Sequence, residues 1–393
     1  MTTTTSALLF FAFGIALLES SPARETGRPV SRAGYFVYVG TFTAAATPPE
    51  PPRPSSSKGI YVYRFHPATG QLTPLGLAAE TFSPSFLAVH PHQRFLYAVV
   101  NRKSGGVSSF AIDPQSGKLT FLNEVASHGD NPCFVDTDRK GQNVLVANYT
   151  SGSVAVLPIR RDGRLAEATA AVQHTGSGAD PKRQEGPHAH MISTSLDDRF
   201  AVAADLGLDK LLVYRFDAGK GTLTPNDPPF ARVKAGVGPR HFFFHPTGKF
   251  AYVINEMAST ITAFGYDYRS GTFKELQTVS TLAPDFKGEN TGAEIKVHPS
   301  GKFLYASNRG LDSIAVFAID PKKGTLTQVE QVSTRGKSPR AFELDPTGSF
   351  LFAANQVSEN LAMFRVDRTT GRLTPIGQVS VPVPACVKFV PAE

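Results

Sequence analysis

The chain has 393 residues, with 40 Lys and Arg against 33 Asp and Glu, which gives a formal net charge of +7. Hydrophobic residues make up 41% of it, so we exclude a disordered chain and expect a large core. Two cysteines and no tryptophan exclude a disulfide scaffold, a cysteine-rich zinc module and WD-type repeats. Because no block of five Lys or Arg residues occurs, we expect a small anionic molecule as partner rather than nucleic acid.

The N-terminal segment carries a twelve-residue apolar run, ALLFFAFGIALL, from Ala7 to Leu18. This run is too short to span a bilayer and has the length of the apolar region of a secretory signal, so we predict no membrane span. We therefore predict a signal peptide over residues 1–23 and export to the periplasm or the extracellular space. No Lys or Arg precedes the run, which keeps a cytoplasmic location open as the alternative.

A short glycine-led segment recurs seven times along the chain. Its copies are GQLT at Gly70, GKLT at Gly117, GRLA at Gly163, GTLT at Gly221, GTFK at Gly271, GTLT at Gly324 and GRLT at Gly371. Successive glycines are 47, 46, 58, 50, 53 and 47 residues apart. Periods of this size, without a helical 3.6-residue pattern between the glycines, favour four-stranded propeller blades over a helical solenoid. The sequence therefore predicts an all-β, seven-bladed β-propeller.

A second recurring unit consists of an apolar strand, a turn and another apolar strand. It appears as FLAVHPHQRFLYAVVN from Phe86, FFFHPTGKFAYVINE from Phe242, IKVHPSGKFLYASNR from Ile295 and FELDPTGSFLFAANQ from Phe342. Proline followed by glycine suits a tight turn, so these units are β-hairpins. We accordingly interpret His90, His245 and His298 as turn residues and not as ligands.

The seventh hairpin has to be assembled from both ends of the chain. ACVKFV from Ala385 supplies one strand and YFVYVGT from Tyr35 its partner, and their pairing would close the ring and remove exposed sheet edges. We predict one propeller domain over residues 33–391 and a monomer. Two separate β-domains are disfavoured because no linker interrupts the repeats.

The repeats also locate a candidate site, because the first strand of each blade lines the central channel of a propeller. First strands are predicted to start at Ser85, Cys133, His188, Arg240, Glu294, Arg340 and Ala385, and second strands to end at Arg102, Tyr149, Leu206, Glu256, Arg309, Gln356 and Thr41. These ends converge on one face, and most are polar, which indicates a binding mouth. The alternative is a structural ion-pair network around a wet channel.

Long connections run into the same face. They are Phe42 to Lys58, Ala166 to Glu185 and Thr281 to Thr291. Long loops in compact domains are often binding loops or lids, although the proline-rich first one could equally be a disordered insertion.

The sequence resembles the seven-bladed propeller lactonases, a family that includes the bacterial propeller-type 6-phosphogluconolactonases and the fungal carboxy-muconate cyclases. The likeness covers nearly the whole chain after residue 33, and its most specific parts are GPHAH at Gly186, GPRHFFFHPTGKFAYVINE at Gly238, HPSGKFLYASNR at His298 and SPRAFELDPTG at Ser338. The resemblance implies a His, Arg, Glu and Arg site at His188 or His190, Arg240, Glu256 and Arg309. It implies no obligatory metal or cofactor, and the leader puts the phosphorylated substrate in doubt.

Lactone opening needs a base for the attacking water and cationic donors for the oxygen that gains charge. His188 and His190 lie two apart, so on a strand both would face one side, with one as base and the other orienting it; a purely structural pair is the alternative. Arg240 and Arg309 would hold the substrate's anionic group and stabilise the oxyanion.

The remaining ring residues support these groups. Glu256 would brace an arginine or the base, or be purely structural if it only neutralises Arg309. We assign Glu294, Arg340 and Gln356 to substrate binding.

Other chemistries are weaker. His188 and His190 with a ring glutamate could bind a divalent metal, but a lone HxH is common. Cys133 could be a nucleophile, yet an inner-strand cysteine is more often packed, and a bridge to Cys386 would have to span two blades. No phosphate-binding glycine-rich loop or G-x-S-x-G elbow occurs. The predicted function is cofactor-free hydrolysis of a sugar lactone, 6-phosphogluconolactone or a related aldonolactone, with a cycloisomerase or a non-catalytic binding propeller as alternatives.

Overall fold

The computed structural model describes residues 1–2, 34–43 and 55–393. The predicted signal peptide and most of the loop between Phe42 and Lys58 lie outside the described residues. All regular elements in the described part of the chain are β-strands. None of the described segments forms a helix with the length and apolarity needed to cross a membrane.

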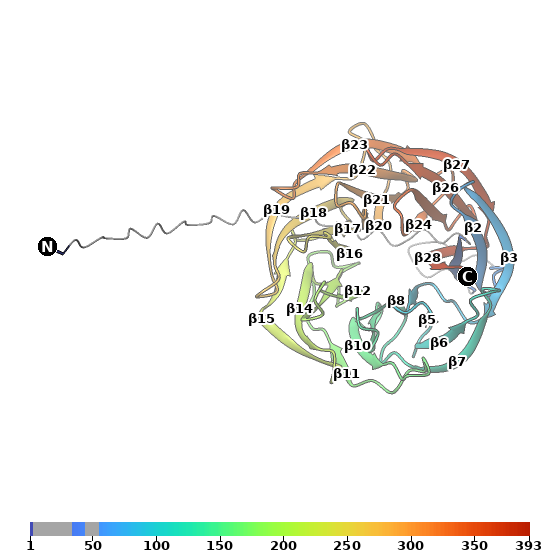
Figure 1. The fold of residues 1–393 in the computed structure, drawn as a ribbon, viewed down its shortest axis with the longest axis horizontal. Coiled ribbons are helices and arrows are strands. Elements are labelled where there is room, and N and C mark those ends of the chain that lie inside the picture. Colours follow the sequence, from blue (N-terminus) through green and yellow to red (C-terminus); the bar gives the residue numbers. More distant parts are fainter. Residues whose placement is uncertain (3–33, 44–54) are drawn as a thin grey trace.

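Seven four-stranded sheets stand around a central channel as the blades of a propeller, which confirms the predicted fold class (Figure 1). From the inside outwards, the strands are β28 (Pro384–Pro391), β1 (Tyr35–Thr41), β2 (Gly59–His66) and β3 (Gln71–Glu80) in blade one; β4 (Leu87–Val89), β5 (Phe95–Val100), β6 (Gly106–Ile112) and β7 (Leu119–Ala126) in blade two; and β8 (Pro132–Thr137), β9 (Asn143–Asn148), β10 (Ser153–Pro158) and β11 (Ala170–Gln173) in blade three.

The other four blades repeat this order. They contain β12 (Ala189–Thr194), β13 (Phe200–Asp205), β14 (Lys210–Asp217) and β15 (Thr222–Arg232) in blade four; β16 (Pro239–Phe244), β17 (Phe250–Asn255), β18 (Thr260–Asp267) and β19 (Thr272–Ser280) in blade five; β20 (Thr291–Val297), β21 (Phe303–Arg309), β22 (Ser313–Ile319) and β23 (Leu326–Ser333) in blade six; and β24 (Pro339–Leu344), β25 (Phe350–Asn355), β26 (Asn360–Val366) and β27 (Leu373–Ser380) in blade seven.

The ring is closed by the two ends of the chain, as predicted. Strand β28 pairs antiparallel with β1, with Val37 opposite Phe389 and Val39 opposite Val387. Blade one therefore has its inner strand from the C-terminal end of the sequence and its other three from the N-terminal end. Every blade therefore has four strands, and neither end of the array is left as an unpaired strand.

The seven repeat glycines occupy the turns between the third and fourth strands of the blades. All seven have φ between 65° and 85°, a region that other residues enter only at a cost. Gly324 shows a second reason, because a Cβ there would lie 2.3 Å from the ring of Phe250 in the preceding blade. The repeated glycine is thus required both by the turn and by close packing between blades.

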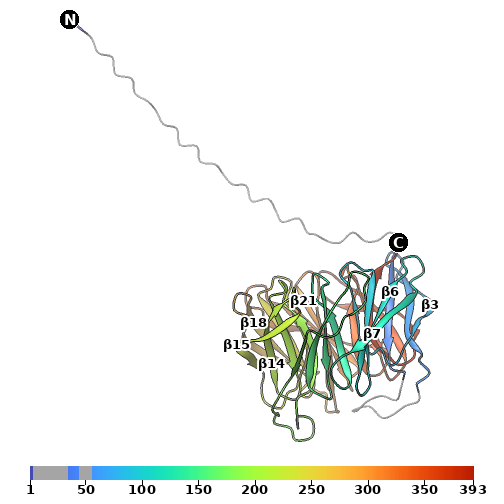
Figure 2. The same ribbon diagram turned by 90° about the horizontal axis from the view of Figure 1, so that it is seen from below.

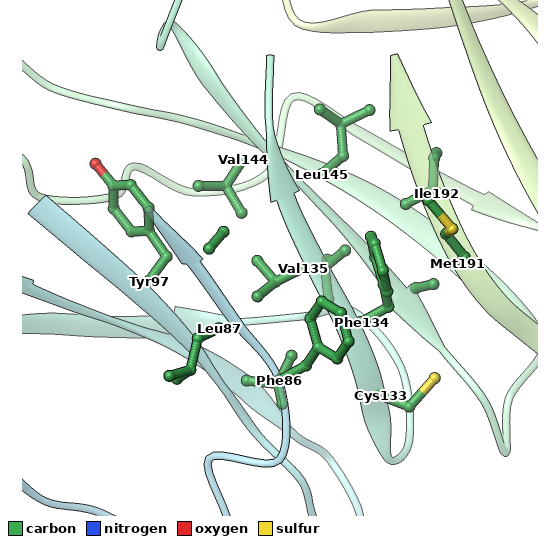
Figure 3. Packing of buried hydrophobic residues seen from close by; sticks show 14 of the residues in the cluster. Phe86, Leu87, Tyr97, Cys133, Phe134, Val135, Val144, Leu145, Met191 and Ile192 are labelled. Atoms are coloured by element: carbon green, nitrogen blue, oxygen red, sulfur yellow. The ribbon is translucent and has the colours of Figure 1, made fainter. Parts of the chain in front are cut away.

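The core lies between neighbouring blades. Second strands such as β9, β13 and β17 are buried along their whole length, which explains their unbroken apolar sequences. Figure 3 shows how side chains from three successive blades interlock, with the labelled ones being Phe86, Leu87, Tyr97, Cys133, Phe134, Val135, Val144, Leu145, Met191 and Ile192.

The turn histidines connect the blades on one face. His90 Nε2 lies 3.1 Å from the carbonyl oxygen of Gly141, and His245 Nε2 lies 2.9 Å from that of Gly301. Their assignment as turn residues is therefore confirmed. In Figure 2 the C-terminus lies on the upper face of the disc, where β28 ends, so the inner strands begin on the lower face.

Candidate active site

Most inner strands carry a β-bulge near the residue that begins them on the lower face. The register of β8 shifts between Pro132 and Phe134, that of β12 between Ala189 and Met191, that of β16 between Pro239 and His241, that of β20 between Gly292 and Ile295, and that of β24 between Pro339 and Ala341. The residues skipped by the pairing are Cys133, His190, Arg240, Ala293, Glu294 and Arg340. A bulge redirects a side chain, and here the bulges direct the polar side chains among these residues into the channel.

The bulges correct one prediction. The sequence alignment of the repeats matched His188 with Cys133 and Arg240, whereas His190 is the equivalent residue in the structure. His188 instead precedes β12. Alternation along a regular strand could not anticipate this, because a bulge inserts one residue without changing the apolar pattern of the rest of the strand.

A cavity of about 440 Å³ opens on this face. Its lining residues are Asn101, Asn131, Cys133, Tyr149, Thr150, Lys182, Arg183, Glu185, His188, His190, Glu256, Arg309 and Arg340. The structure therefore brings together five of the predicted residues, which are His188, His190, Glu256, Arg309 and Arg340. Four cationic side chains against two carboxylates make the cavity suited to an anionic ligand.

Glu256 joins three arginines beneath and beside the cavity. Its Oε2 lies 3.0 Å from Arg240 Nε and 3.0 Å from Arg309 Nη2, and its Oε1 lies 2.7 Å from Arg183 Nη2. Burial alone would raise the pKa of Glu256, but Arg309 and Arg240 outweigh burial and hold the pKa well below its usual range. The glutamate is therefore an anion at neutral and at mildly acidic pH.

Arg240, which was predicted to hold the substrate, is not among the residues that line the cavity. Its side chain is only 2% exposed, and Nη1 donates to the carbonyl oxygen of Ala293 at 2.5 Å. Burial lowers the pKa of Arg240 to about 9, which still leaves the guanidinium charged at neutral pH. Arg240 holds Glu256 from below, and Glu256 in turn holds Arg183 and Arg309 at the cavity wall.

His188 is oriented by two partners of its own and not by His190. Its Nδ1 lies 3.1 Å from the carbonyl oxygen of Tyr149, and its ring stacks on the Tyr149 ring at a centroid distance of 4.7 Å. Because a carbonyl only accepts, Nδ1 carries the hydrogen, and Nε2 is left to accept a proton. Nε2 lies 3.2 Å from Oε1 of Glu185, a carboxylate able to stabilise the imidazolium.

Comparison with known proteins identifies the family of the chain. The family model "Lactonase, 7-bladed beta-propeller" matches residues 36–389. The chain belongs to this lactonase family. A 6-phosphogluconolactonase of Bacillus subtilis is 41% identical over 312 residues, which cover 79% of this chain and 85% of that protein. A 6-phosphogluconolactonase of Formosa agariphila is 33% identical over 79% of this chain and 86% of its own length.

Solved structures show the same likeness. The periplasmic gluconolactonase of Pseudomonas aeruginosa superposes with a TM-score of 0.85 at 35% identity, covering 91% of this chain and 99% of that one. The chain is thus an enzyme of the propeller lactonase family, which acts on lactones, and the alternative of a non-catalytic propeller is set aside.

His190 lies deeper in the lactonase than His188. Its ring meets the ring of Tyr149 edge to face at 5.5 Å and that of His241 at 5.0 Å. Burial, with the positive charge of Arg240, lowers the pKa of His190 well below its usual value, so this imidazole is neutral. Burial also raises the pKa of the neighbouring Cys133 thiol to about 12, which removes support for a cysteine nucleophile.

Two residues predicted to bind substrate lie elsewhere in the lactonase. Glu294 is buried, accepts a hydrogen bond from His241 Nδ1 at 3.1 Å and lines a separate channel cavity of about 300 Å³. Gln356 is 3% exposed and is not among the residues of the active-site cavity. The repeats correctly predicted that both residues lie at the end of the channel that holds the cavity. Their side chains point away from the cavity, because Glu294 lies at the bulge in β20 and Gln356 follows the end of β25.

The segment from Ala166 to Glu185 was predicted as one long loop, but its first part forms β11. The connection from β11 to β12 supplies cavity residues that the sequence analysis missed, which are Lys182, Arg183 and Glu185. Gln184 anchors this loop: it is fully buried, its Oε1 accepts the amides of Ala179 and Asp180 at 2.9 Å, and its Nε2 donates to Leu206 O at 2.8 Å. The only sequence signal was loop length, since no repeat covers this segment. The loop from Thr281 contributes nothing to the cavity.

Within the described part of the chain, no group of three His, Cys, Asp or Glu side chains is arranged to hold a metal ion. The alternative of a metal at His188 and His190 therefore has no support from the described residues. Cys133 and Cys386 are both buried and free.

Proposed function

We propose that this lactonase hydrolyses an anionic sugar lactone, 6-phosphogluconolactone or a related aldonolactone. The observation that carries the proposal is the pairing, in one cavity, of His188, whose Nδ1 hydrogen is committed to a carbonyl, with the cations of Lys182, Arg183, Arg309 and Arg340. His188 supplies a base, and the four cations bind an anion. The names of the relatives from Bacillus subtilis and Pseudomonas aeruginosa support a lactone of this class.

In the proposed reaction, His188 Nε2 takes a proton from water as the water oxygen forms a bond to the lactone carbonyl carbon. Glu185, whose side chain is 59% exposed and free to move, turns aside to admit the water and then accepts the new Nε2 hydrogen. The Tyr149 carbonyl keeps the imidazole in one orientation throughout. General base assistance of this kind contributes about 10²- to 10⁴-fold to a rate.

The carbonyl oxygen gains a negative charge as the water adds. Arg309 and Arg340 line the cavity and are assigned to this oxyanion and to the substrate's anionic group. The tetrahedral intermediate then collapses, the bond from carbon to the ring oxygen breaks, and the imidazolium of His188 returns its proton to that oxygen. The hydroxyl of the water is now on the carbonyl carbon and its proton is on the former ring oxygen, so the product is a single open-chain hydroxy acid and the enzyme is back in its starting state.

His190 and Glu256 are given supporting roles. The neutral His190 is available as a hydrogen-bonding group for a substrate hydroxyl, and its low pKa makes it a weaker base than an exposed imidazole. Glu256 fixes the positions of Arg183 and Arg309, so that the guanidinium groups need no rearrangement when charge develops.

Export is part of the proposal. The apolar run from Ala7 to Leu18 supports it, as does the periplasmic location in the name of the Pseudomonas aeruginosa structure. N-terminal sequencing of the protein recovered from the periplasm or the medium of the host tests this. A mature N-terminus near residue 24 is expected, and an intact N-terminus found only in the cytoplasm would contradict it.

The test of function follows ring opening of 6-phosphogluconolactone, gluconolactone and carboxy-muconolactone, with spontaneous hydrolysis subtracted. His188→Asn is expected to lower kcat by about 10²- to 10⁴-fold on the preferred aldonolactone, and His190→Asn by about tenfold. Turnover of carboxy-muconolactone alone would favour the cycloisomerase. Equal losses in the two variants would refute His188 as the base.

A further inference from the structure

A second cavity, of about 520 Å³, lies among the hairpin turns of blades two, three and four. Its walls come from the β4–β5 turn, the β8–β9 turn, the segment after β10 and the β14–β15 turn. The first two join inner to second strands and the other two join third to fourth strands, and because the strands alternate in direction, both kinds lie on the face opposite the active-site cavity. We call this cavity the turn groove.

The lining of the turn groove is strongly basic. Its charged members are Arg94, Lys140, Arg160, Arg161 and Lys220, with His90 and His92 beside them, and no Asp or Glu is found among its described lining residues. All five cationic residues are exposed. The ion pair from Lys220 to Asp217 at 3.3 Å is solvated on both sides and offsets little of this charge.

The floor of the turn groove is rigid and polar. Asn143 Nδ2 donates to the carbonyl oxygen of Ala218 at 2.8 Å, and Thr169 Oγ1 donates to that of Gly221 at 2.8 Å. His90 Nε2 bonds to the carbonyl oxygen of Gly141. Three blades are thus connected under the cationic side chains, so the shape of the groove is fixed before anything binds.

One turn at the wall of this groove differs in sequence from the equivalent turns of the other blades. In five blades the turn that ends at the repeat glycine begins with an aspartate four residues earlier, and these residues are Asp113, Asp217, Asp267, Asp320 and Asp367. Each aspartate accepts backbone hydrogens within its own turn, as Asp320 does from Lys322 and Lys323 at 2.8 and 2.9 Å. Blade three has Arg160 at the start of a turn that is one residue shorter. Its carboxylate comes two residues later, at Asp162, which accepts the backbone hydrogen of Arg164 at 3.1 Å, so the first two positions of the turn are free for Arg160 and Arg161 at the wall of the groove.

We propose that the turn groove binds a small anion that carries two or more phosphate groups. Its volume lies in the range of small-molecule sites. Cations from four separate segments surround it, which is more positive charge than a single phosphate can neutralise. Guanidinium groups bind phosphate oxygens in pairs, and lysines add charge to them. The proposal is independent of the lactone site, which lies on the other face.

Isothermal titration of the full chain with tripolyphosphate and with orthophosphate, at about 0.15 M salt, tests the proposal. The groove variant is Arg160→Asp/Arg161→Ala, which restores the aspartate that five other turns carry. The matched control is Lys322→Asp/Lys323→Ala, which makes the same change of charge in the exposed turn of blade six. Lactone hydrolysis, expected to be unchanged in both variants, reports that each is folded.

We expect tripolyphosphate to bind the wild type at least about tenfold more tightly than orthophosphate, and the groove variant to lose at least about tenfold in affinity while the control loses less than about twofold. Equal losses in the two variants would overturn the proposal, since net charge alone would then explain binding. Absence of heat at this salt concentration, or displacement of tripolyphosphate from both variants alike by a short DNA strand, would overturn it too. If the groove variant misfolds, Arg160→Gln/Arg161→Gln replaces it, with at least about a fivefold loss expected.

Discussion

The carboxylate of Glu256 lies 3.0 Å from Nε of Arg240, and both side chains are more than nine-tenths buried. The two come from neighbouring strands, Arg240 at the bulge of β16 and Glu256 directly after β17. Charges this deep are costly unless they are paired, and Glu256 is paired three times. The ion pair therefore holds the arginines of the active-site cavity in fixed positions.

Replacing Glu256 by Gln should damage both stability and activity. Three guanidinium groups would lose their shared anion, and removal of one partner from a buried ion pair costs about 3–5 kcal/mol. We expect a fall of that size in the free energy of unfolding in urea. We also expect kcat/KM to fall at least about 100-fold in the molecules that remain folded, because Arg183 and Arg309 lose their positions.

Glu343→Gln is the matched control for this variant. Glu343 also holds two cations, with Lys296 Nζ at 3.1 Å and Lys388 Nζ at 3.3 Å, but it lies outside the active-site cavity. It should lower stability and leave kcat within about threefold of wild type. If Glu343→Gln impaired catalysis as much as Glu256→Gln, the loss would come from weakened folding and not from the cavity.

Arg183→Gln should act mainly on substrate binding. The Arg183 guanidinium lines the cavity, and its pKa is raised by Glu256 although burial opposes this, so it is always charged. Glu256 keeps its other two arginines in the variant. We expect KM for a phosphorylated lactone to rise about tenfold with a smaller change in kcat, measured by steady-state kinetics at low and high salt. A change in kcat alone would argue that Arg183 contacts the reacting carbonyl instead.

His241 should make the protein less stable in acid. Burial, with Arg240 beside it, lowers the pKa of His241 well below its usual value, and the neutral imidazole donates to Glu294. In the unfolded chain this imidazole takes up a proton near pH 6.5, whereas in the folded chain it stays neutral. The free energy of unfolding therefore falls as the pH drops below that value. For one such group the loss between pH 7.5 and pH 5.0 is about 2 kcal/mol.

Urea unfolding of the wild type and of His241→Gln at these two pH values measures the effect. The variant lacks the titrating group, so its difference in stability between the two pH values should be smaller by about 2 kcal/mol. His190 changes in the same direction and stays in both proteins. Ending at pH 5.0 keeps Glu256 out of the comparison, because its stabilising contribution is lost only as the pH falls below its unfolded value near 4.5. Identical pH dependence in the two proteins would contradict the prediction.

Gly324→Ala should destabilise the fold without touching the active site. The residue has φ of 70°, and the new Cβ would collide with Phe250 at 2.3 Å. Strain and forced repacking together should cost about 2–4 kcal/mol, measured as a lower urea midpoint. Gly265→Ala in β18 is the control, since its Cβ would meet only atoms 3.8 Å away or farther, and it should be neutral. Equal effects would mean that the repeat glycine is not required by packing.

The propeller could be predicted from the sequence because its determinants are local and repeated. The glycine at each outer turn is required by that turn, and the apolar runs of the second strands result from burial on both faces. Ring closure was predictable too, since one strand was left without a partner at each end of the chain. His188, Glu256, Arg309 and Arg340 were found because strand ends recur at equivalent positions in every blade, whereas His190 was found from the family resemblance.

Tertiary structure decided which of these residues reach the cavity. Bulges set the direction of Arg240 and Glu294, and a bulge adds one residue without altering the alternation that a sequence displays. Arg183 and Glu185 come from a loop outside the repeats, whose position depends on Gln184 and its buried hydrogen bonds. The sequence by itself determined the fold and the end of the channel at which the site lies, because both depend on contacts that recur in every blade. Only the folded chain determined the partners of each charge, because each of those contacts occurs once, between segments far apart in the sequence.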